Sequence, residues 1–442
     1  MKKFSSKISS WLTPVAMKFS NQRHLCAIRD GFVVLMPLVI VSSFFILINN
    51  VILDSNNGIL RNIVDLSRYQ AIGNQVYNGT LGFLSILIAF TVAYKLSESY
   101  GEDGLISGVI SVAVLVTMFP STLEIVPIGA DKPVEVMGAI SQNETSATGL
   151  LFAIISALVG TEIFLRLQKN NKFKISLPDT VPLAVSKSFS ALIPAFITLT
   201  LFGVIVFIIE SLFGFGLQDL VVKLIQKPLS AVFQGMIGIN IVMLFQNLLW
   251  SLGIHGTFVL GPITEPTLLV AIQENINAFN VGLDIPNIVT KPFIDSFAML
   301  GGGGCTIGLI IAILIASKRE EDKGIAKLSI APGLFNINEP LMFGLPVILN
   351  PILAIPLILV PLINLNIAYI ATRLGLISKT VVMVPWTTPP ILSAYLSTAG
   401  DWRAAVLAAL LIGISIIVYL PFVMATNIVS PHTELEDENT EI

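Results

Sequence analysis

The sequence predicts an all-α integral membrane protein with about ten transmembrane helices, two re-entrant hairpins and amphipathic helices at the membrane interface. Hydrophobic residues make up 54% of the chain and charged residues only 12%, whereas soluble domains carry about 25% charged residues. The mean hydropathy is +0.84. Apolar stretches also recur at the length of about twenty residues that a helix needs to cross a bilayer. A soluble fold could not bury this much apolar surface.

The chain begins with a basic segment, residues 1–28, which we interpret as cytoplasmic and interfacial. Phe4, Ile8 and Trp11 recur at helical spacing beside Lys3 and Lys7. Such a pattern favours a short helix lying in the membrane surface. The alternative is an unstructured tail. The segment lacks the continuous apolar core and the small-residue cleavage site of a signal peptide.

The apolar stretches that follow predict the transmembrane helices in order. Residues 251–275 and 327–351 are also apolar but are interrupted by prolines, so we interpret both as re-entrant or broken helices. The predicted spans are 31–52, 80–97, 105–121, 148–166, 189–213, 231–250, 293–316, 352–371, 378–396 and 403–425.

The distribution of charge predicts the orientation in the membrane. Lysine and arginine gather in the N-terminal segment and in the loops 166–187 and 317–327, whereas the loop 122–147 is acidic. Because basic loops face the cytoplasm, we expect cytoplasmic N- and C-termini and an external loop at 122–147. The acidic tail, residues 428–442, is expected to be a disordered cytoplasmic tail.

Composition and motifs exclude several classes of function. The net charge of −3 gives no basic footprint for nucleic acid. Cys26 and Cys305 lie far apart and form no disulfide framework or metal-ligand spacing, so no cofactor and no metal are expected. The run Gly301–Gly304 lacks the Lys-Ser/Thr of a phosphate loop and is more typical of close helix packing or a hinge.

The first break in the membrane pattern lies at residues 246–256. Gln246, Asn247, Trp250 and His255 place amides, an indole and an imidazole within an otherwise apolar run. Polar side chains at membrane depth are costly, about 2.5–3.5 kcal/mol for a charge on insertion scales, and so predict a functional site, where we expect Gln246 and Asn247 to bind substrate. A histidine satisfied by a neighbouring carbonyl is the structural alternative.

The second break is the segment Phe335–Gly344, which contains Asn336, Asn338 and Glu339. Glu339 precedes Pro340, which favours a turn at the tip of a hairpin. An unpaired carboxylate there needs polar partners, and sugar hydroxyls could supply them. The alternative is a structural glutamate paired with a basic residue at the cytoplasmic rim.

The third break surrounds Trp386, which Pro385, Pro389 and Pro390 flank. An aromatic face suits the C–H side of a pyranose ring, although a tryptophan at a membrane interface is equally consistent with the sequence. Lys291 and Asp295 lie four residues apart, which predicts an ion pair on one helix face. The pattern favours a structural pair, and contact of either residue with solute is the alternative.

These motifs together resemble a known family. Asn336-Ile337-Asn338-Glu339-Pro340, with Phe343-Gly344-Leu345-Pro346 and Asn350-Pro351, resembles the signature of the permease subunit, enzyme IIC, of the bacterial sugar phosphotransferase system. The segments Arg23–Phe32, Leu192–Ala195 and Pro292–Phe297 resemble the lactose, cellobiose and diacetylchitobiose group. The resemblance covers nearly the whole chain.

The resemblance implies a multi-pass homodimer in the bacterial cytoplasmic membrane that binds a disaccharide. It implies a scaffold and dimerisation domain at residues 29–230, and a transport domain at 231–427 that shifts like an elevator. Glu339 and His255 would orient the sugar hydroxyl at C6, and Trp250 and Trp386 would line the pocket with Asn336 and Asn338. Separate IIB and IIA chains would deliver phosphate from phosphoenolpyruvate.

Two other functions remain open on the residues alone. Glu339 and His255 could form the proton relay of a proton-coupled disaccharide symporter, which would deliver unmodified sugar. A membrane receptor or assembly protein is the other alternative, but such a protein has no need to bury a carboxylate.

Overall fold

The computed structural model describes residues 14, 17–18, 21–53, 60, 66–127, 132–175, 177–178, 180–345 and 347–427. The predicted interfacial helix around Phe4, Ile8 and Trp11 and the predicted acidic tail at 428–442 lie outside these residues. The described chain is mainly helical, as the hydropathy pattern predicts.

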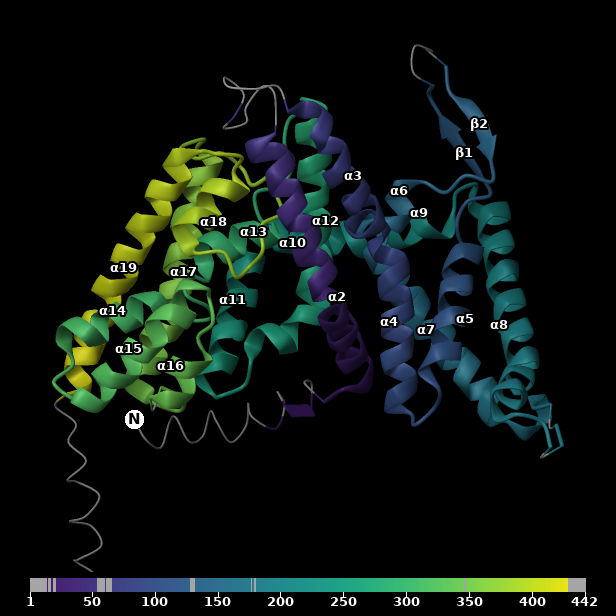
Figure 1. Cartoon of the computed structure of the whole chain (residues 1–442), viewed down its shortest axis with the longest axis horizontal. Coiled ribbons are helices and arrows are strands. Elements are labelled where there is room, and N and C mark those ends of the chain that lie inside the picture. Colours follow the sequence, from purple (N-terminus) through teal and green to yellow (C-terminus); the bar gives the residue numbers. More distant parts are fainter. Residues whose placement is uncertain are drawn as a thin grey trace, which may run out of the picture.

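The first half of the chain packs around α4, which contacts α2, α5 and α7 (Figure 1). Asp103 begins α5 by accepting a hydrogen bond of 3.0 Å from the amide of Leu105, which satisfies one of the free donors at the helix start. The elements are α2 Arg23–Leu47, η1 Ile48–Ile52, η2 Ser67–Tyr69, α3 Gln70–Gly79, η3 Leu81–Phe83, α4 Leu84–Ser99, α5 Gly104–Thr117, α6 Gln142–Thr145, η4 Ala147–Gly149, α7 Leu150–Lys169, η5 Asn171–Phe173, α8 Leu183–Phe213 and α9 Leu217–Val221.

A two-stranded antiparallel hairpin projects from this half and was not predicted (Figure 1). Strand β1 spans Thr122–Ile125 and β2 spans Val134–Met137, with Thr122 opposite Met137 and Ile125 opposite Val134. β-Branched residues favour the strands. The hairpin falls within the loop predicted to be external.

The second half packs α19 against α14 and α17 (Figure 1). Asn350 begins α17 by accepting hydrogen bonds from the amides of Ile352 and Leu353. The elements are η6 Val222–Gln226, α10 Lys227–Gln234, α11 Met236–Ser251, α12 Gly256–Asn280, α13 Lys291–Phe293, η7 Ile294–Ala298, α14 Thr306–Ala316, α15 Glu320–Leu334, α16 Glu339–Gly344, α17 Pro351–Arg373, α18 Pro390–Ser397 and α19 Trp402–Thr426.

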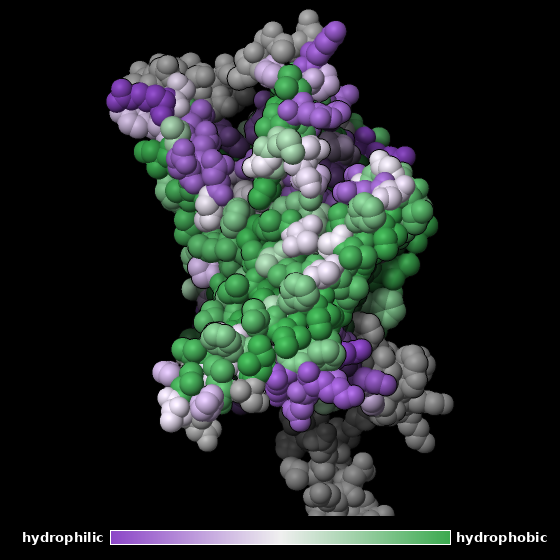
Figure 2. Space-filling view, turned by 90° about the vertical axis from the view of Figure 1, so that its right-hand side faces the viewer, coloured by the Kyte–Doolittle hydropathy of each residue, from purple (hydrophilic) through white to green (hydrophobic). Residues whose placement is uncertain are grey.

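Long apolar helices give the molecule a membrane-spanning belt. Within the described residues, six helices are long and apolar enough to cross a membrane, or seven if the bent pair Leu217–Gln234 and Met236–Ser251 forms one span. Figure 2 shows a hydrophobic band between two polar ends. The exterior of a membrane protein faces hydrocarbon, so this banding fits a multi-pass protein.

Three of the predicted spans are not continuous helices, which corrects the sequence-based assignment. In the predicted span 231–250, Gly235 separates α10 from α11, and the chain bends by 83° there. In the predicted span 378–396, regular helix is confined to α18. Three prolines there remove backbone donors, and the amides of Val381 and Val382 instead donate to the carbonyl of Ser397 at 2.8 and 3.0 Å. The predicted span 293–316 is divided by a loop between η7 and α14. Non-helical backbone is tolerated at the last two places because it is buried in protein.

The two proline-containing regions contain three breaks between them, the last of which follows Gly344 and separates α16 from α17. The first lies at 252–255, between α11 and α12, while Pro262 and Pro266 lie inside the continuous helix α12. The second lies at 335–338, between α15 and α16. His255 therefore lies in the first break, Asn336 and Asn338 lie in the second, and Glu339 begins α16.

The buried side chains form two large hydrophobic clusters. One is drawn from residues between Phe233 and Val423. The other is drawn mainly from residues between Ala27 and Val206, joined by Leu269, Ile272 and Ile276 of α12 and by the segment Val381–Val384. Helix α12 therefore contributes to both clusters.

Candidate functional site

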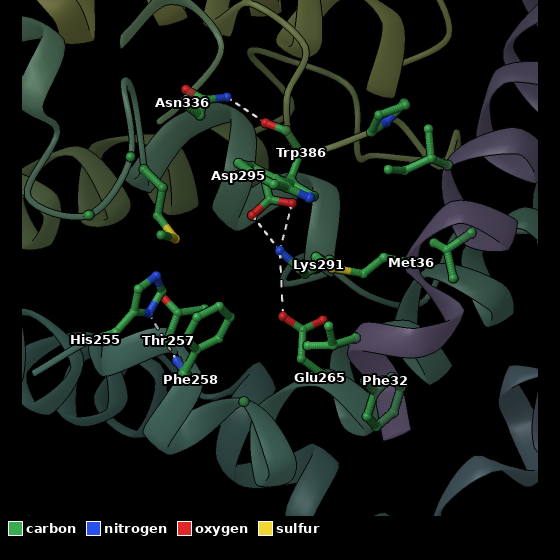
Figure 3. A pocket seen from close by; sticks show the side chains of 18 of the residues that line it. Phe32, Met36, His255, Thr257, Phe258, Glu265, Lys291, Asp295, Asn336 and Trp386 are labelled. Carbon is green, nitrogen blue, oxygen red and sulfur yellow. Dashed lines mark hydrogen bonds and ion pairs between the residues drawn. The ribbon is translucent and has the colours of Figure 1, made fainter. Parts of the chain in front are cut away.

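A cavity of about 240 Å³ lies where α2, α12, the glycine loop 301–304 and the breaks before α12 and α16 meet (Figure 3). Helix α2 supplies one wall, which is mainly apolar through Phe32 and Met36 but includes Arg29 and Ser43. The remaining walls come from α11, α12, α13, η7, the glycine loop 301–304, the break before α16 and the segment 383–386. The cavity thus gathers all three breaks predicted from the sequence.

His255 and Glu339 face one another on the cavity wall, with 3.7 Å between His255 Nε2 and Glu339 Oε1. That distance is too long for a direct hydrogen bond. His255 precedes α12, and its Nδ1 accepts a hydrogen bond of 3.2 Å from the amide of Phe258. We therefore assign the proton of the neutral ring to Nε2, the atom nearer Glu339. The pair offers one donor and one acceptor to a third group.

Aromatic rings fix the orientation of the imidazole. The His255 ring stacks on Phe258 with centroids 3.8 Å apart, and lies 4.3 Å from Trp250. Trp250 is 2% exposed and lines the cavity together with Trp386. Among the described residues, neither indole Nε1 has a hydrogen-bond partner. A buried unpaired donor is costly, about 1–3 kcal/mol, so a ligand acceptor would be favourable at either indole.

Asn336 and Asn338 lie on the cavity wall, but their side chains join the loops of the site. Asn338 Nδ2 donates to the carbonyl of Gly303 at 2.9 Å. Asn336 Oδ1 accepts from the amide of Gly301 at 2.8 Å, and its Nδ2 donates to the carbonyls of Trp386 and Thr388. The two asparagines therefore hold the glycine loop and the Trp386 segment beside Glu339.

Asn247 and Gln246 lie behind the glycine loop instead of on the main cavity. Asn247 is fully buried; its Nδ2 donates to the carbonyl of Met243, and its Oδ1 accepts from the amide of Gly304 at 2.9 Å. Gln246 Nε2 lies 3.4 Å from the Met299 sulfur and borders a separate hollow of about 20 Å³. The polar groups of these two residues support the site from outside its walls.

The glycine loop has a backbone that other residues would strain. Gly301, Gly302 and Gly304 have φ values of +82°, +99° and +83°, in the left-handed region. Gly303 lies against Trp250, where an added Cβ would be 2.5 Å from Nε1. The glycines therefore permit both the turn and the close approach of the indole.

Lys291 has a second partner, Glu265, which was not predicted from the sequence. As predicted, Lys291 pairs with Asp295, and its Nζ lies 2.7 and 2.8 Å from the two carboxylate oxygens. Glu265 of α12 lies 3.6 Å from the same Nζ, and all three side chains line the cavity (Figure 3). The available signal was a single glutamate between Pro262 and Pro266 in an apolar helix.

The chain matches known proteins over nearly its whole length. A family model described as "Phosphotransferase system, EIIC" matches residues 29–361. The lichenan permease IIC component of Bacillus subtilis (strain 168) is 36% identical over 424 residues, which cover 96% of this chain and 93% of the relative. The cellobiose-specific EIIC component of Geobacillus stearothermophilus is 35% identical over 430 residues, 96% of this chain and 94% of the relative.

A solved structure shares the fold. The crystal structure of the transporter ChbC, the IIC component from the N,N'-diacetylchitobiose-specific phosphotransferase system, superposes with a TM-score of 0.89 at 33% sequence identity. The alignment covers 98% of this chain and 100% of that one.

Proposed function

The chain belongs to the EIIC family of the phosphotransferase system, and we propose that it binds a disaccharide of the cellobiose or diacetylchitobiose type in the cavity and carries it inward. The names of the relatives support this substrate class. The observation that carries the proposal is the pair His255 and Glu339, facing one another across 3.7 Å on the wall of an otherwise largely apolar cavity.

The cavity offers the two kinds of surface that a sugar needs. Trp250 and Trp386 can stack on the C–H faces of pyranose rings, and each has an indole N–H without a protein partner among the described residues. His255 and Glu339 can bind one hydroxyl from both sides, as donor and as acceptor. Hydrogen bonds to a charged acceptor contribute about 1.5–3 kcal/mol each.

We propose that this bound hydroxyl is the one at C6, which accepts phosphate from phospho-IIB. An oxygen–phosphorus bond forms while the sulfur–phosphorus bond to the IIB cysteine breaks. Glu339 takes the hydroxyl proton, and the thiolate leaves with IIB. Such proton transfer contributes typically about 10²–10⁴-fold to rate. IIB and IIA are proposed to be separate cytoplasmic partners.

We propose that transport moves residues 231–427 as a domain against a scaffold at residues 29–230. Two observations support this proposal: the buried side chains form two clusters, and the cavity lies between the α2 wall and the remaining walls. Alternating access requires two arrangements within a few kcal/mol of one another. We also propose a homodimer; the exposed apolar residues Phe196, Phe207 and Leu212 of α8 can face lipid or a second subunit.

Uptake of labelled cellobiose tests the proposed function. A bacterium lacking its own permeases would express the full chain together with IIB and IIA proteins, and the label would be recovered from inside. We expect cellobiose phosphate, formed only with phosphoenolpyruvate and unaffected by collapse of the proton gradient. Recovery of free cellobiose that disappears with the gradient would establish a proton-coupled symporter instead and overturn the proposal.

A further inference from the structure

The ion cluster formed by Glu265, Lys291 and Asp295 contains one amino group and two carboxyl groups. Lys291 is held mainly by Asp295, with distances of 2.7 and 2.8 Å to its two oxygens. The Asp295 side chain is 7% exposed and Lys291 is 16% exposed. Within this cluster, Asp295 therefore balances the positive charge of Lys291, and the carboxylate of Glu265 has no cation of its own.

Glu265 is the member of the cluster that remains open to the cavity. Its side chain is 24% exposed, and its Oε1 lies 3.6 Å from Lys291 Nζ. That distance exceeds a hydrogen bond, and no hydrogen bond to Glu265 occurs among the described residues. A partly buried carboxylate with free acceptor sites gains from hydrogen-bond donors, so a ligand that supplies hydroxyl groups would be stabilised there.

A second unpaired polar group lies on the same face of α12. Thr257, Gly261 and Glu265 are four residues apart, so they share one helix face, and all three line the cavity. Thr257 Oγ1 is buried and has no hydrogen-bond partner among the described residues. The neighbouring α2 wall, with Phe32 and Met36, also carries Arg29 and Ser43, but Arg29 Nε donates to Asp30 Oδ1 at 2.8 Å and the Ser43 hydroxyl donates to the carbonyl of Val39. This face of α12 therefore forms a polar strip separate from the His255–Glu339 pair.

We propose that Glu265 determines specificity: it binds hydroxyl groups of the disaccharide away from the phosphate-accepting end, and it excludes sugars that carry an anionic group. The inference rests on the proposed function of the cavity. Hydroxyl donors satisfy the free carboxylate, whereas an anion meets an excess negative charge in a poorly solvated site and finds Lys291 already paired.

Binding of two sugars to the purified full chain tests this inference. Calorimetry would compare cellobiose with cellobionate, which carries a carboxylate at its reducing end, for the wild type, Glu265→Gln, Glu265→Asp and the control Glu274→Gln. Glu274 lies on the same helix but outside the cavity walls. Glu265→Gln keeps the shape and removes the charge, whereas Glu265→Asp keeps the charge and shortens the reach.

We expect the wild type to prefer cellobiose strongly. Glu265→Gln should weaken cellobiose binding about tenfold or more and reduce the preference for cellobiose over cellobionate by at least about tenfold. Glu265→Asp should weaken cellobiose binding by a similar factor but keep the wild-type preference for cellobiose over the anionic sugar. Glu274→Gln should match the wild type. Thermal unfolding of each variant would show that the comparison is made on folded protein.

Two outcomes would overturn the inference. An unchanged ratio of the two affinities in Glu265→Gln would show that the carboxyl group exerts no charge selection. Equal losses for both sugars in both Glu265 variants would assign Glu265 a structural role with Lys291. If the wild type bound neither cellobiose nor diacetylchitobiose, the proposed function itself would fail, which is a separate result.

Discussion

The side-chain amide of Asn336 donates a hydrogen bond of 2.6 Å to the backbone carbonyl of Trp386, fifty residues further along the chain. Its oxygen accepts from Gly301, so one side chain connects the α15–α16 break, the glycine loop and the Trp386 segment. Asn336 itself has a φ of +61°, a conformation that asparagine adopts more readily than most residues. Position 336 therefore requires both a residue that tolerates a positive φ and a side-chain amide.

Replacing Asn336 by glycine or alanine separates these two demands. Both variants lose the hydrogen bonds to Gly301, Trp386 and Thr388, so both should weaken cellobiose binding about tenfold or more. Asn336→Ala should also be less stable than Asn336→Gly by about 1–2 kcal/mol, because alanine is strained at positive φ. Thermal unfolding and calorimetry would measure the two effects. Equal stability of the two variants would contradict the backbone argument.

Gly303 provides a second test, because the indole of Trp250 lies against it. A Cβ at this position would be 2.5 Å from Trp250 Nε1, closer than any ordinary contact. Gly303→Ala should therefore displace the indole, lower stability by about 1–3 kcal/mol and weaken cellobiose binding. Gly413→Ala in α19 is the matched control, since its Cβ would meet open space and alanine favours helix. Comparable losses in both variants would argue against a specific packing role.

The sequence predicted where the membrane pattern breaks, but not how the breaks fit together. Polar and proline-rich runs at Gln246–Gly256, Phe335–Gly344 and around Trp386 stand out from apolar surroundings, and all three meet near one cavity. Local patterns carry this information because intramembrane polar groups are costly wherever they lie. The Lys291–Asp295 pair was predictable for the same local reason, from its spacing of four residues.

Contacts between residues far apart in the chain could not be predicted from the sequence. Glu265 joins Lys291 from another helix, and no periodic pattern connects the two positions. The predicted span 378–396 failed similarly: its apolar composition suits a helix, but the amides of Val381 and Val382 bond to Ser397 instead. Asn247 is a further example. Its neighbours in the sequence do not indicate that its side-chain oxygen accepts a hydrogen bond from the amide of Gly304 in the glycine loop and does not bind a ligand.

The orientation of the chain is a further prediction. If basic loops face the cytoplasm, the hairpin β1–β2 lies outside and the start of α15 lies inside. Single cysteines at Glu135 of β2 and at Glu320 of α15, both exposed, would be introduced into a Cys26→Ser background. An impermeant maleimide added to intact cells should label Glu135→Cys but reach Glu320→Cys only after permeabilisation. The reverse pattern would invert the proposed topology.

The proposed role of Glu339 as proton acceptor can be tested by removing its charge. Glu339→Gln keeps the size of the side chain and an acceptor oxygen but cannot take up the hydroxyl proton. Phosphoenolpyruvate-dependent phosphorylation of labelled cellobiose, measured in inverted vesicles with IIB and IIA, should fall by about 10²-fold or more. Cellobiose binding should weaken less, by about tenfold, because one charged hydrogen bond is lost. Glu320→Gln, which alters an exposed carboxylate paired with Lys323, should leave both measurements unchanged. If Glu339→Gln bound cellobiose weakly but phosphorylated the bound sugar at the wild-type rate, Glu339 would hold the sugar without accepting its proton.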